Sequence, residues 1–230
     1  MIGYLAAMAK ANTANTTISV DIISDIVCPW CWVGVKLFEK AAKQSGKNIS
    51  LSWRPYMLDP AVPEGGVPYP EYMKQKFSNG PSDRFKEMRA HLEKIGPSLG
   101  IDFKFDDIPM RPNTLDAHRL LKWAQGQGKG DAASQALFEA FFTDLNDVGD
   151  KDVLIEVGKN IGMDDKVISD LLSQDDHKNA VREEIMFFRN LGVNAVPTFI
   201  YNGQFAVQGA QPVEAHLKAI EKAVQNPAIA

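Results

Sequence analysis

The residues best suited to chemistry in this chain are its two cysteines. Cys28 and Cys31 are the only ones among 230 residues, and only Pro29 and Trp30 separate them. This spacing allows an intramolecular disulfide, and we expect a chain that keeps only such a pair to use it in thiol–disulfide exchange. A structural zinc site would need two more ligands, and one close pair is not the framework of a disulfide-stabilised secreted protein. The competing interpretation makes both thiols core residues, because free cysteine is commonly buried.

The two thiols are expected to take different roles because of their places on a helix. Cys28 stands just before the first turn, where unpaired backbone N–H groups and the positive end of the helix dipole stabilise a thiolate. We therefore expect Cys28 to be the nucleophile. Cys31 follows one turn later, less exposed, and is expected to attack the mixed disulfide formed on Cys28. Asp25, three residues before Cys28, is either a proton acceptor that tunes the thiol or an ordinary turn residue.

The segment that carries the cysteines is predicted to be a β-α-β unit. The run from Thr17 to Ser24 is rich in β-branched residues and predicts a strand. The apolar segment after Pro29 predicts a buried helix that ends near Gly46. Ile49 to Tyr56 predicts a second strand. A helix between two strands of one sheet indicates parallel pairing with a right-handed crossover.

The rest of the chain divides at a stretch rich in proline and glycine, from Pro60 to Pro70. Beyond it apolar residues recur with helical spacing, and we predict that residues 61–192 are all helical. Strand patterns return around Asn202-Gly203, a dipeptide typical of hairpin turns, and a closing amphipathic helix begins at Pro212. We therefore predict a disordered extension at residues 1–16, a discontinuous domain at 17–60 and 193–230, and an inserted helical domain at 61–192.

Composition and charge narrow the class of protein. The chain is 45% hydrophobic and 23% charged, as ordinary globular proteins are. A formal net charge of -4 without a long basic run excludes nucleic acid and anionic membrane as primary partners. The apolar stretch Met1–Ala9 has no preceding positive region and is at the short limit for a signal sequence. We therefore expect a cytoplasmic protein.

Three further segments are as distinctive as the cysteine motif. Ser24 to Cys31 reads SDIVCPWC, Asn113 to Leu120 reads NTLDAHRL, Gly192 to Phe199 reads GVNAVPTF, and Gly209 to Pro212 reads GAQP. In this order they resemble the active-site segment and the other recurring segments of the FrnE-type subgroup of DsbA-like oxidoreductases. Four such segments in the right order are much harder to obtain by chance than the cysteine motif alone.

This resemblance implies an α/β fold: a thioredoxin fold, β-α-β followed by β-β-α, interrupted by a large all-helical domain. It implies a reductase or isomerase of protein disulfides. It also implies a cis peptide before Pro197, so that Val196 and Pro197 face the disulfide and bind an extended substrate. Without the resemblance, a trans proline at an edge strand would be favoured. His118 is placed on a helix over the disulfide, and Trp30 stands where strongly oxidising relatives carry histidine, which indicates modest oxidising power.

The expected partners follow from the same reasoning. We expect no metal and no cofactor beyond the redox-active disulfide, disulfide-containing proteins or small thiols as substrates, and glutathione as one candidate reductant. The sequence does not decide between a monomer and a homodimer. Two alternatives stay open. One is a glutathione-dependent isomerase or transferase, like the 2-hydroxychromene-2-carboxylate isomerases and kappa-class transferases, which generally present serine at the position of Cys28. The other is a redox-sensing module that binds client proteins without turnover.

Overall fold

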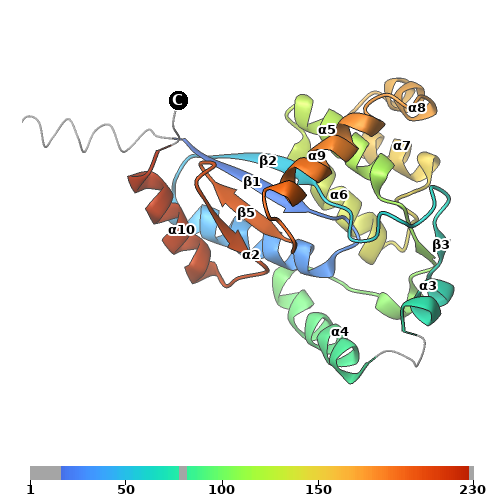
Figure 1. The fold of residues 1–230 in the computed structure, drawn as a ribbon, viewed down its shortest axis with the longest axis horizontal. Helices are drawn as coiled ribbons and strands as arrows, with labels where there is room; N and C mark the ends of the chain where they lie inside the picture. Colours follow the sequence, from blue (N-terminus) through green and yellow to red (C-terminus); the bar gives the residue numbers. More distant parts are fainter. Residues whose placement is uncertain (1–16, 78–81, 228–230) are drawn as a thin grey trace, which may run out of the picture.

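Strand β1 (Ile18–Ser24) and helix α2 (Pro29–Ser45) hold the cysteine motif at their junction. The computed structural model describes residues 17–77 and 82–227, and the proposed extension at the N-terminus lies outside these residues (Figure 1). Strand β1 pairs in parallel with β2 (Ile49–Pro55), and α2 connects the two. The predicted β-α-β unit is therefore confirmed.

The sheet is completed by the last two strands of the chain. Strands β5 (Thr198–Tyr201) and β6 (Phe205–Gln208) form an antiparallel hairpin, and β5 pairs with β1, so the order is β2-β1-β5-β6. Asn202 and Gly203 have φ values of 50° and 67°. Positive φ at both central residues is what a type I′ hairpin turn requires. The predicted hairpin is confirmed.

Helix α10 (Val213–Gln225) packs beside α2 on one face of the sheet. Phe38 of α2 stacks on Phe199 of β5 with ring centroids 5.3 Å apart. His216 of α10 meets the edges of both rings. The two helices and the sheet thereby share one aromatic core, which anchors the closing β-β-α unit to the helix that carries the cysteines.

The segment between β2 and β5 is mainly helical. Its helices are α3 (Tyr69–Lys76), α4 (Asp83–Ile95), α5 (Leu115–Gly126), α6 (Gly130–Phe142), α7 (Lys151–Asn160), α8 (Asp165–Ser173) and α9 (Lys178–Asn190). Two short 3₁₀ turns, Gly96–Leu99 and Phe105–Asp107, join α4 to the following segment. Among the helices that the structure describes, none is long and apolar enough to cross a membrane.

Helix α9 lies against the face of the sheet opposite α2 (Figure 1). Phe188 of α9 packs with Ile23 of β1 in a small buried cluster. Arg54 of β2 also ties the helix to the sheet, because its guanidinium contacts Asp21 at 2.7 Å and Glu184 of α9 at 3.0 Å. The insertion is thus fixed to the sheet by both apolar and ionic contacts.

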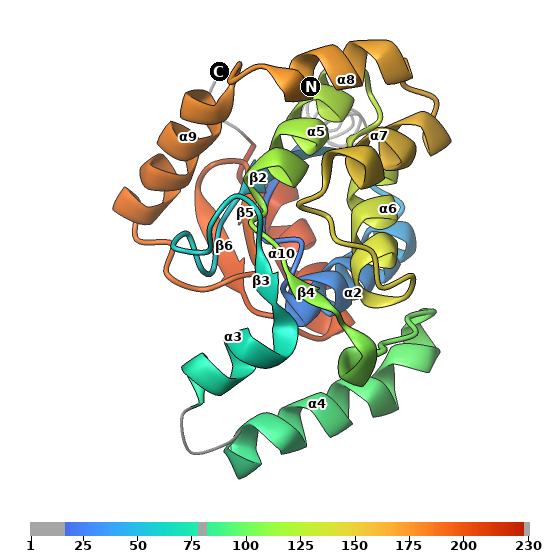
Figure 2. The same cartoon turned by 90° about the vertical axis from the view of Figure 1, so that its right-hand side faces the viewer.

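The prediction that residues 61–192 are all helical is wrong at one place. Strand β3 (Val67–Pro68) pairs antiparallel with β4 (Met110–Arg111) and forms a second, two-stranded sheet. The prolines at positions 68, 70, 109 and 112 explain the difference, because proline and the residue before it favour extended backbone. The ladder brings α3 next to the segment that follows α4 (Figure 2). The division of the chain into domains stays a prediction.

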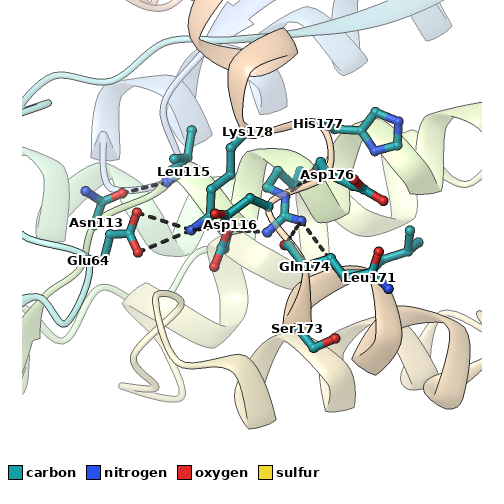
Figure 3. A network of polar contacts seen from close by, with 12 residues as sticks. Glu64, Asn113, Leu115, Asp116, Leu171, Ser173, Gln174, Asp176, His177 and Lys178 are labelled. Atoms are coloured by element: carbon teal, nitrogen blue, oxygen red, sulfur yellow. Dashed lines mark hydrogen bonds and ion pairs between the residues drawn. The ribbon is translucent and has the colours of Figure 1, made fainter.

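A buried arginine fixes helix α5 in place. Arg119 is fully buried, and its guanidinium donates to the carboxylate of Asp116 and to the carbonyl oxygens of Leu171, Gln174 and Asp176 at distances of 2.6 to 2.8 Å (Figure 3). These carbonyls belong to the end of α8 and the turn into α9, so one charged group satisfies several orphan acceptors. The network anchors α5 to the end of α8 and the turn into α9. It thereby also positions His118, which precedes Arg119 on the same helix.

Candidate active site

Cys28 occupies the N-cap position of helix α2, and Pro29 follows it in the first turn. The backbone carbonyl of Cys28 accepts from the N–H of Cys31 at 3.0 Å, and the N–H of Cys28 donates to the carbonyl of Asp25 at 3.0 Å. Cys28 is 5% exposed. It stands at the positive end of the helix dipole, and its side chain makes no capping hydrogen bond to the N–H groups of the first turn.

Cys31 lies one turn further along and is fully buried, and both cysteines are free thiols. Burial holds the pKa of the Cys31 thiol well above its ordinary value, and hydrogen bonding to Cys28 and the negative charge of its thiolate raise it further. The backbone of Asp25 and the hydroxyl of Ser24 act in the opposite direction by stabilising the Cys31 thiolate. Cys31 is therefore a neutral thiol at neutral pH and needs a proton acceptor before it can attack.

The peptide bond between Val196 and Pro197 is cis, as the resemblance to DsbA-like proteins implies. The thiol of Cys28 points at the carbonyl oxygen of Val196, with 4.0 Å between sulfur and oxygen. The N–H of Gly209 donates to the carbonyl of Pro197 at 2.7 Å and holds this loop against β6. Val196 and Pro197 thus lie beside Cys28, from the opposite end of the chain.

A glycine that the sequence analysis missed determines how closely this loop approaches α2. A Cβ atom on Gly34 would lie 2.7 Å from Cγ of Pro197 and 3.4 Å from Cα of Ala210. Real Cβ contacts of the first length do not occur without displacement of a neighbour. Gly34 follows Cys31 by three residues, so the same helix face holds the cysteines and receives the proline loop. A glycine in a helix interior, which costs stability relative to alanine, was the available signal.

Asp25 makes the contacts of a turn residue, and its role as a proton acceptor stays a prediction. As a turn residue, it accepts the N–H of Cys28 on its backbone carbonyl and the N–H of Leu58 on Oδ2 at 2.8 Å. As a titratable group, it is a carboxylate buried beside the cysteine motif. Its second oxygen, Oδ1, has no hydrogen bond and lies 3.5 Å from Nε2 of His118.

His118 of α5 reaches the site through its Nε2 atom. This nitrogen lies 2.9 Å from the backbone carbonyl of Tyr56, which can only accept, so Nε2 carries a hydrogen. In the neutral imidazole Nδ1 then has a free lone pair, and no group in the described part of the chain hydrogen-bonds it. Among the described residues, Oδ1 of Asp25 and Nδ1 of His118 are thus the atoms of this pair without a hydrogen bond. Only the resemblance pointed to His118.

Trp30, the remaining residue of the motif, lies against the insertion. Its ring lies against that of His91 of α4, with centroids 5.9 Å apart and the ring planes tilted by 31°. Trp30 places no cation near Cys28, unlike a histidine at the same position. The structure thus brings together every residue that the sequence analysis named for the site, and adds Gly34 and the contact between His118 and Asp25.

Comparisons with known proteins concern the family and the fold of the chain. A sequence model of the family described as DSBA-like thioredoxin domain matches residues 19–221. The uncharacterized protein YwbO of Bacillus subtilis is 28% identical over 205 residues, which cover 89% of this chain and 96% of YwbO. The structure of a probable DsbA oxidoreductase from Streptomyces coelicolor has a TM-score of 0.82 at 27% identity, covering 93% of this chain and 92% of that one. The cytosolic disulfide reductase DsbM from Pseudomonas aeruginosa, solved with GSH, has a TM-score of 0.62 at 16% identity, covering 90% and 99%.

Proposed function

Since this chain belongs to the DSBA-like thioredoxin domain family, we propose that it reduces or isomerises protein disulfides by cycling Cys28 and Cys31 between dithiol and disulfide. The family and its fold support a redox enzyme of the thiol–disulfide class. The proposed cycle of Cys28 and Cys31 rests on the different surroundings of the two thiols. Cys28 stands at the N-cap of α2, and Cys31 is fully buried with a raised pKa.

In the first step the thiolate of Cys28 attacks one sulfur of the substrate disulfide. A bond forms between Cys28 Sγ and that sulfur, the substrate S–S bond breaks, and the other substrate sulfur leaves as a thiolate that takes a proton from solvent. The N-terminal position on α2 supports this role, because the helix end stabilises the attacking thiolate before the reaction.

In the second step Cys31 loses its proton and attacks Sγ of Cys28. The Cys28–Cys31 disulfide forms, and the substrate leaves as its second thiolate, so that two electrons have passed from enzyme to substrate. Two equivalents of an external thiol such as glutathione return the enzyme to the dithiol. In isomerisation the mixed disulfide is instead attacked by another substrate cysteine, and no net electrons are transferred.

The proton of Cys31 is proposed to go to the pair formed by Asp25 and His118. Three facts support this assignment: both side chains are buried, Oδ1 of Asp25 has no hydrogen bond, and Nδ1 of His118 has a free lone pair. The backbone of Asp25 already interacts with Cys31. A proton taken up by the pair gives an imidazolium next to a carboxylate, which is a stable arrangement for a buried site.

The loop of Val196 and Pro197 is proposed to bind the substrate backbone. The carbonyl oxygen of Val196 lies 4.0 Å from the sulfur of Cys28. Cys28 has no hydrogen to donate either as the attacking thiolate or in the mixed disulfide, so this carbonyl is free to accept from an N–H of an extended substrate chain. Substrate binding and the first chemical step are therefore linked at one oxygen atom.

Within the family, we assign the chain to the FrnE-type subgroup. The four segments that carry this resemblance all contribute to one place in the fold. They supply the cysteines and Asp25, His118, Pro197, and the N–H of Gly209 that holds the carbonyl of Pro197. Convergence of segments that are distant in sequence supports a shared mechanism more strongly than the motif alone.

The assignment is tested by insulin reduction with dithiothreitol or glutathione as the electron source. We expect the wild-type chain to turn over and Cys28→Ser to be inactive. Cys31→Ser should accumulate a mixed disulfide with insulin through Cys28, visible by mass spectrometry. Undiminished turnover of Cys28→Ser would contradict the proposal. If that variant instead kept a glutathione-dependent chromene isomerisation, the isomerase alternative would replace it.

The direction of electron flow is tested by the reduction potential of the Cys28–Cys31 disulfide in glutathione buffers. Trp30 adds no positive charge beside Cys28, so the thiolate is stabilised mainly by the helix end. We therefore propose a value nearer about -270 mV, typical of a reductant, than about -120 mV, typical of a strong oxidant. A value at the oxidising end would reverse the proposed direction.

A further inference from the structure

A cavity of about 210 Å³ opens next to the active-site turn, and the mechanism above does not use it. Val27 and Pro29, on either side of Cys28 in the sequence, form one of its walls. The other lining residues come from α3, α4, the segment from the 3₁₀ turn Phe105–Asp107 to β4, the end of α6 and the loop after β2. A molecule in this cavity would therefore lie against the two residues that flank Cys28.

Aromatic rings make up a large share of the lining. Phe85, Phe105 and Phe142 line the cavity together with Tyr69 and Tyr72. Rings of this kind bind flat apolar groups by offset or edge-to-face stacking with centroids about 4.5–7 Å apart. The volume is small, so we expect it to hold one ring or a short apolar group rather than several side chains of a peptide.

The charged residues of the cavity are mainly basic. Lys76, Arg89 and Arg111 line it, and Asp59 is the one acidic residue among the lining residues. The carboxylate of Asp59 receives hydrogen bonds from Arg111 at 2.9 Å and from Lys76 at 3.1 Å. The cavity thus keeps an excess of positive charge although the whole chain has a net charge of -4. This excess favours an anionic ligand.

Two of the cations are placed to receive such a ligand. Arg111 is 6% exposed, and its Nε has no hydrogen-bond partner in the described residues, which is unusual for a buried donor. Arg89 lies over the ring of Phe105, and its one carboxylate partner, Asp106, is on the exposed surface. Because arginine binds carboxylates through paired N–H groups, a carboxylate fits these side chains.

Contacts on two sides fix the position of the cavity relative to the cysteines. The ring of Trp30 contacts that of His91 of α4, and Leu92 of the same helix is fully buried in the core. On the other side the N–H of Tyr69 donates to the carbonyl of Pro109 at 2.9 Å and fixes the start of α3. A bound molecule would therefore be presented to Cys28 by a wall that is tied to the motif itself.

We infer that this cavity is the specificity pocket for a small disulfide whose aromatic body carries a carboxylate. The inference rests on the proposed function and names a substrate class for it. One aryl group would lie between the phenylalanines, with its carboxylate among Arg89, Arg111 and Lys76. The thiolate of Cys28 would attack the adjacent sulfur, forming the mixed disulfide and releasing the other half as an aryl thiolate. Cys31 would then attack Cys28 and release the second aryl thiolate.

The test compares three disulfides in stopped-flow reactions with the reduced protein. Dithiobis-nitrobenzoate is aromatic and carries carboxylates, dithiodipyridine is aromatic and neutral, and hydroxyethyl disulfide is aliphatic and neutral. For Arg89→Gln and Lys76→Gln we expect the rate constant with dithiobis-nitrobenzoate to fall about tenfold, the loss of one charge-assisted contact. With dithiodipyridine the change should stay within about twofold, below 0.5 kcal/mol. Phe85→Ala should slow both aromatic disulfides and leave hydroxyethyl disulfide unchanged.

Lys36→Gln is the matched control, because Lys36 is a cation of α2 that does not line the cavity. It should affect all three disulfides alike. The inference is overturned if Arg89→Gln and Lys76→Gln slow the two aromatic disulfides equally, slow neither, or act no differently from Lys36→Gln. Failure of the wild-type chain to react through Cys28 with any of the three would instead overturn the proposed redox function. The two failures are therefore distinguishable.

Discussion

Nε2 of His118 lies 3.5 Å from Oδ1 of Asp25, and each side chain is 1% exposed. The two residues come from different parts of the chain, one from helix α5 and one from the turn before Cys28. Each side chain also has one buried polar atom without a hydrogen bond among the described residues, Oδ1 in Asp25 and Nδ1 in His118. Their contact joins the active-site turn to helix α5.

Removal of either member of this pair is predicted to slow the second chemical step. In Asp25→Asn or His118→Gln, Cys31 has to ionise against its raised pKa without a neighbouring acceptor. We expect its attack on the mixed disulfide to fall about a hundredfold at pH 7 and to recover as pH rises, while the attack by Cys28 changes little. The two releases of thiopyridone from dithiodipyridine report the two steps separately in a stopped-flow experiment.

The pH profile distinguishes proton transfer from a purely structural role. A variant that merely loosens the turn would slow both steps by a similar factor at every pH. His216→Gln is a suitable control, since His216 is also a buried histidine but belongs to α10 and packs on Phe38 and Phe199. It should leave both steps unchanged. A second step in Asp25→Asn with wild-type rate and wild-type pH dependence would exclude the pair as proton acceptor.

The raised pKa of Cys31 is predicted to make the reduced protein sensitive to alkaline pH. Above about pH 8.5 the unfolded chain releases the thiol proton, while the folded chain retains it. The contribution of this thiol is therefore fully present below the unfolded pKa and is lost as pH rises toward the folded one. Relative to Cys31→Ala, the reduced wild type should lose about 1.4 kcal/mol per pH unit above this point, measured by urea unfolding. A parallel pH dependence of the two proteins would show that the Cys31 thiol ionises freely in the fold.

The close approach of Gly34 to Pro197 is predicted to matter more for activity than for stability. Gly34→Ala places a methyl group 2.7 Å from Cγ of Pro197, so the proline loop must move away from the cysteines. We expect a loss of about 1–3 kcal/mol in unfolding free energy, as for overpacked sites, but a fall of more than about tenfold in insulin reduction. Gly126→Ala is the control, because its Cβ would meet nothing within 4 Å. Full turnover by Gly34→Ala would show that the loop position is not critical.

Local patterns predicted the elements that position the site, whereas contacts between them needed the structure. The β-branched run of β1 and the dipeptide Asn202-Gly203 fix a strand and a turn through backbone preferences of a few neighbouring residues. The contact between Asp25 and His118 depends instead on how α5 packs, which the network of Arg119 determines. The β3–β4 ladder was missed because two-residue strands are too short to show a periodic pattern.

His216 is predicted to make the fold sensitive to acid. Burial lowers the pKa of His216 from its ordinary 6.5 to about 4. Its Nδ1 lies 2.8 Å from the hydroxyl of Tyr201, and its ring makes T-shaped contacts with Phe38 and Phe199. Between pH 6.5 and 4, His216 is protonated in the unfolded chain but stays neutral in the folded chain. The free energy of unfolding therefore falls as pH falls, by roughly 3 kcal/mol in total. His216→Gln retains a partner for Tyr201 but cannot titrate, and urea unfolding between pH 7 and 4 should show a correspondingly flatter curve. Equal slopes for the two proteins would mean that His216 accepts its proton without unfolding.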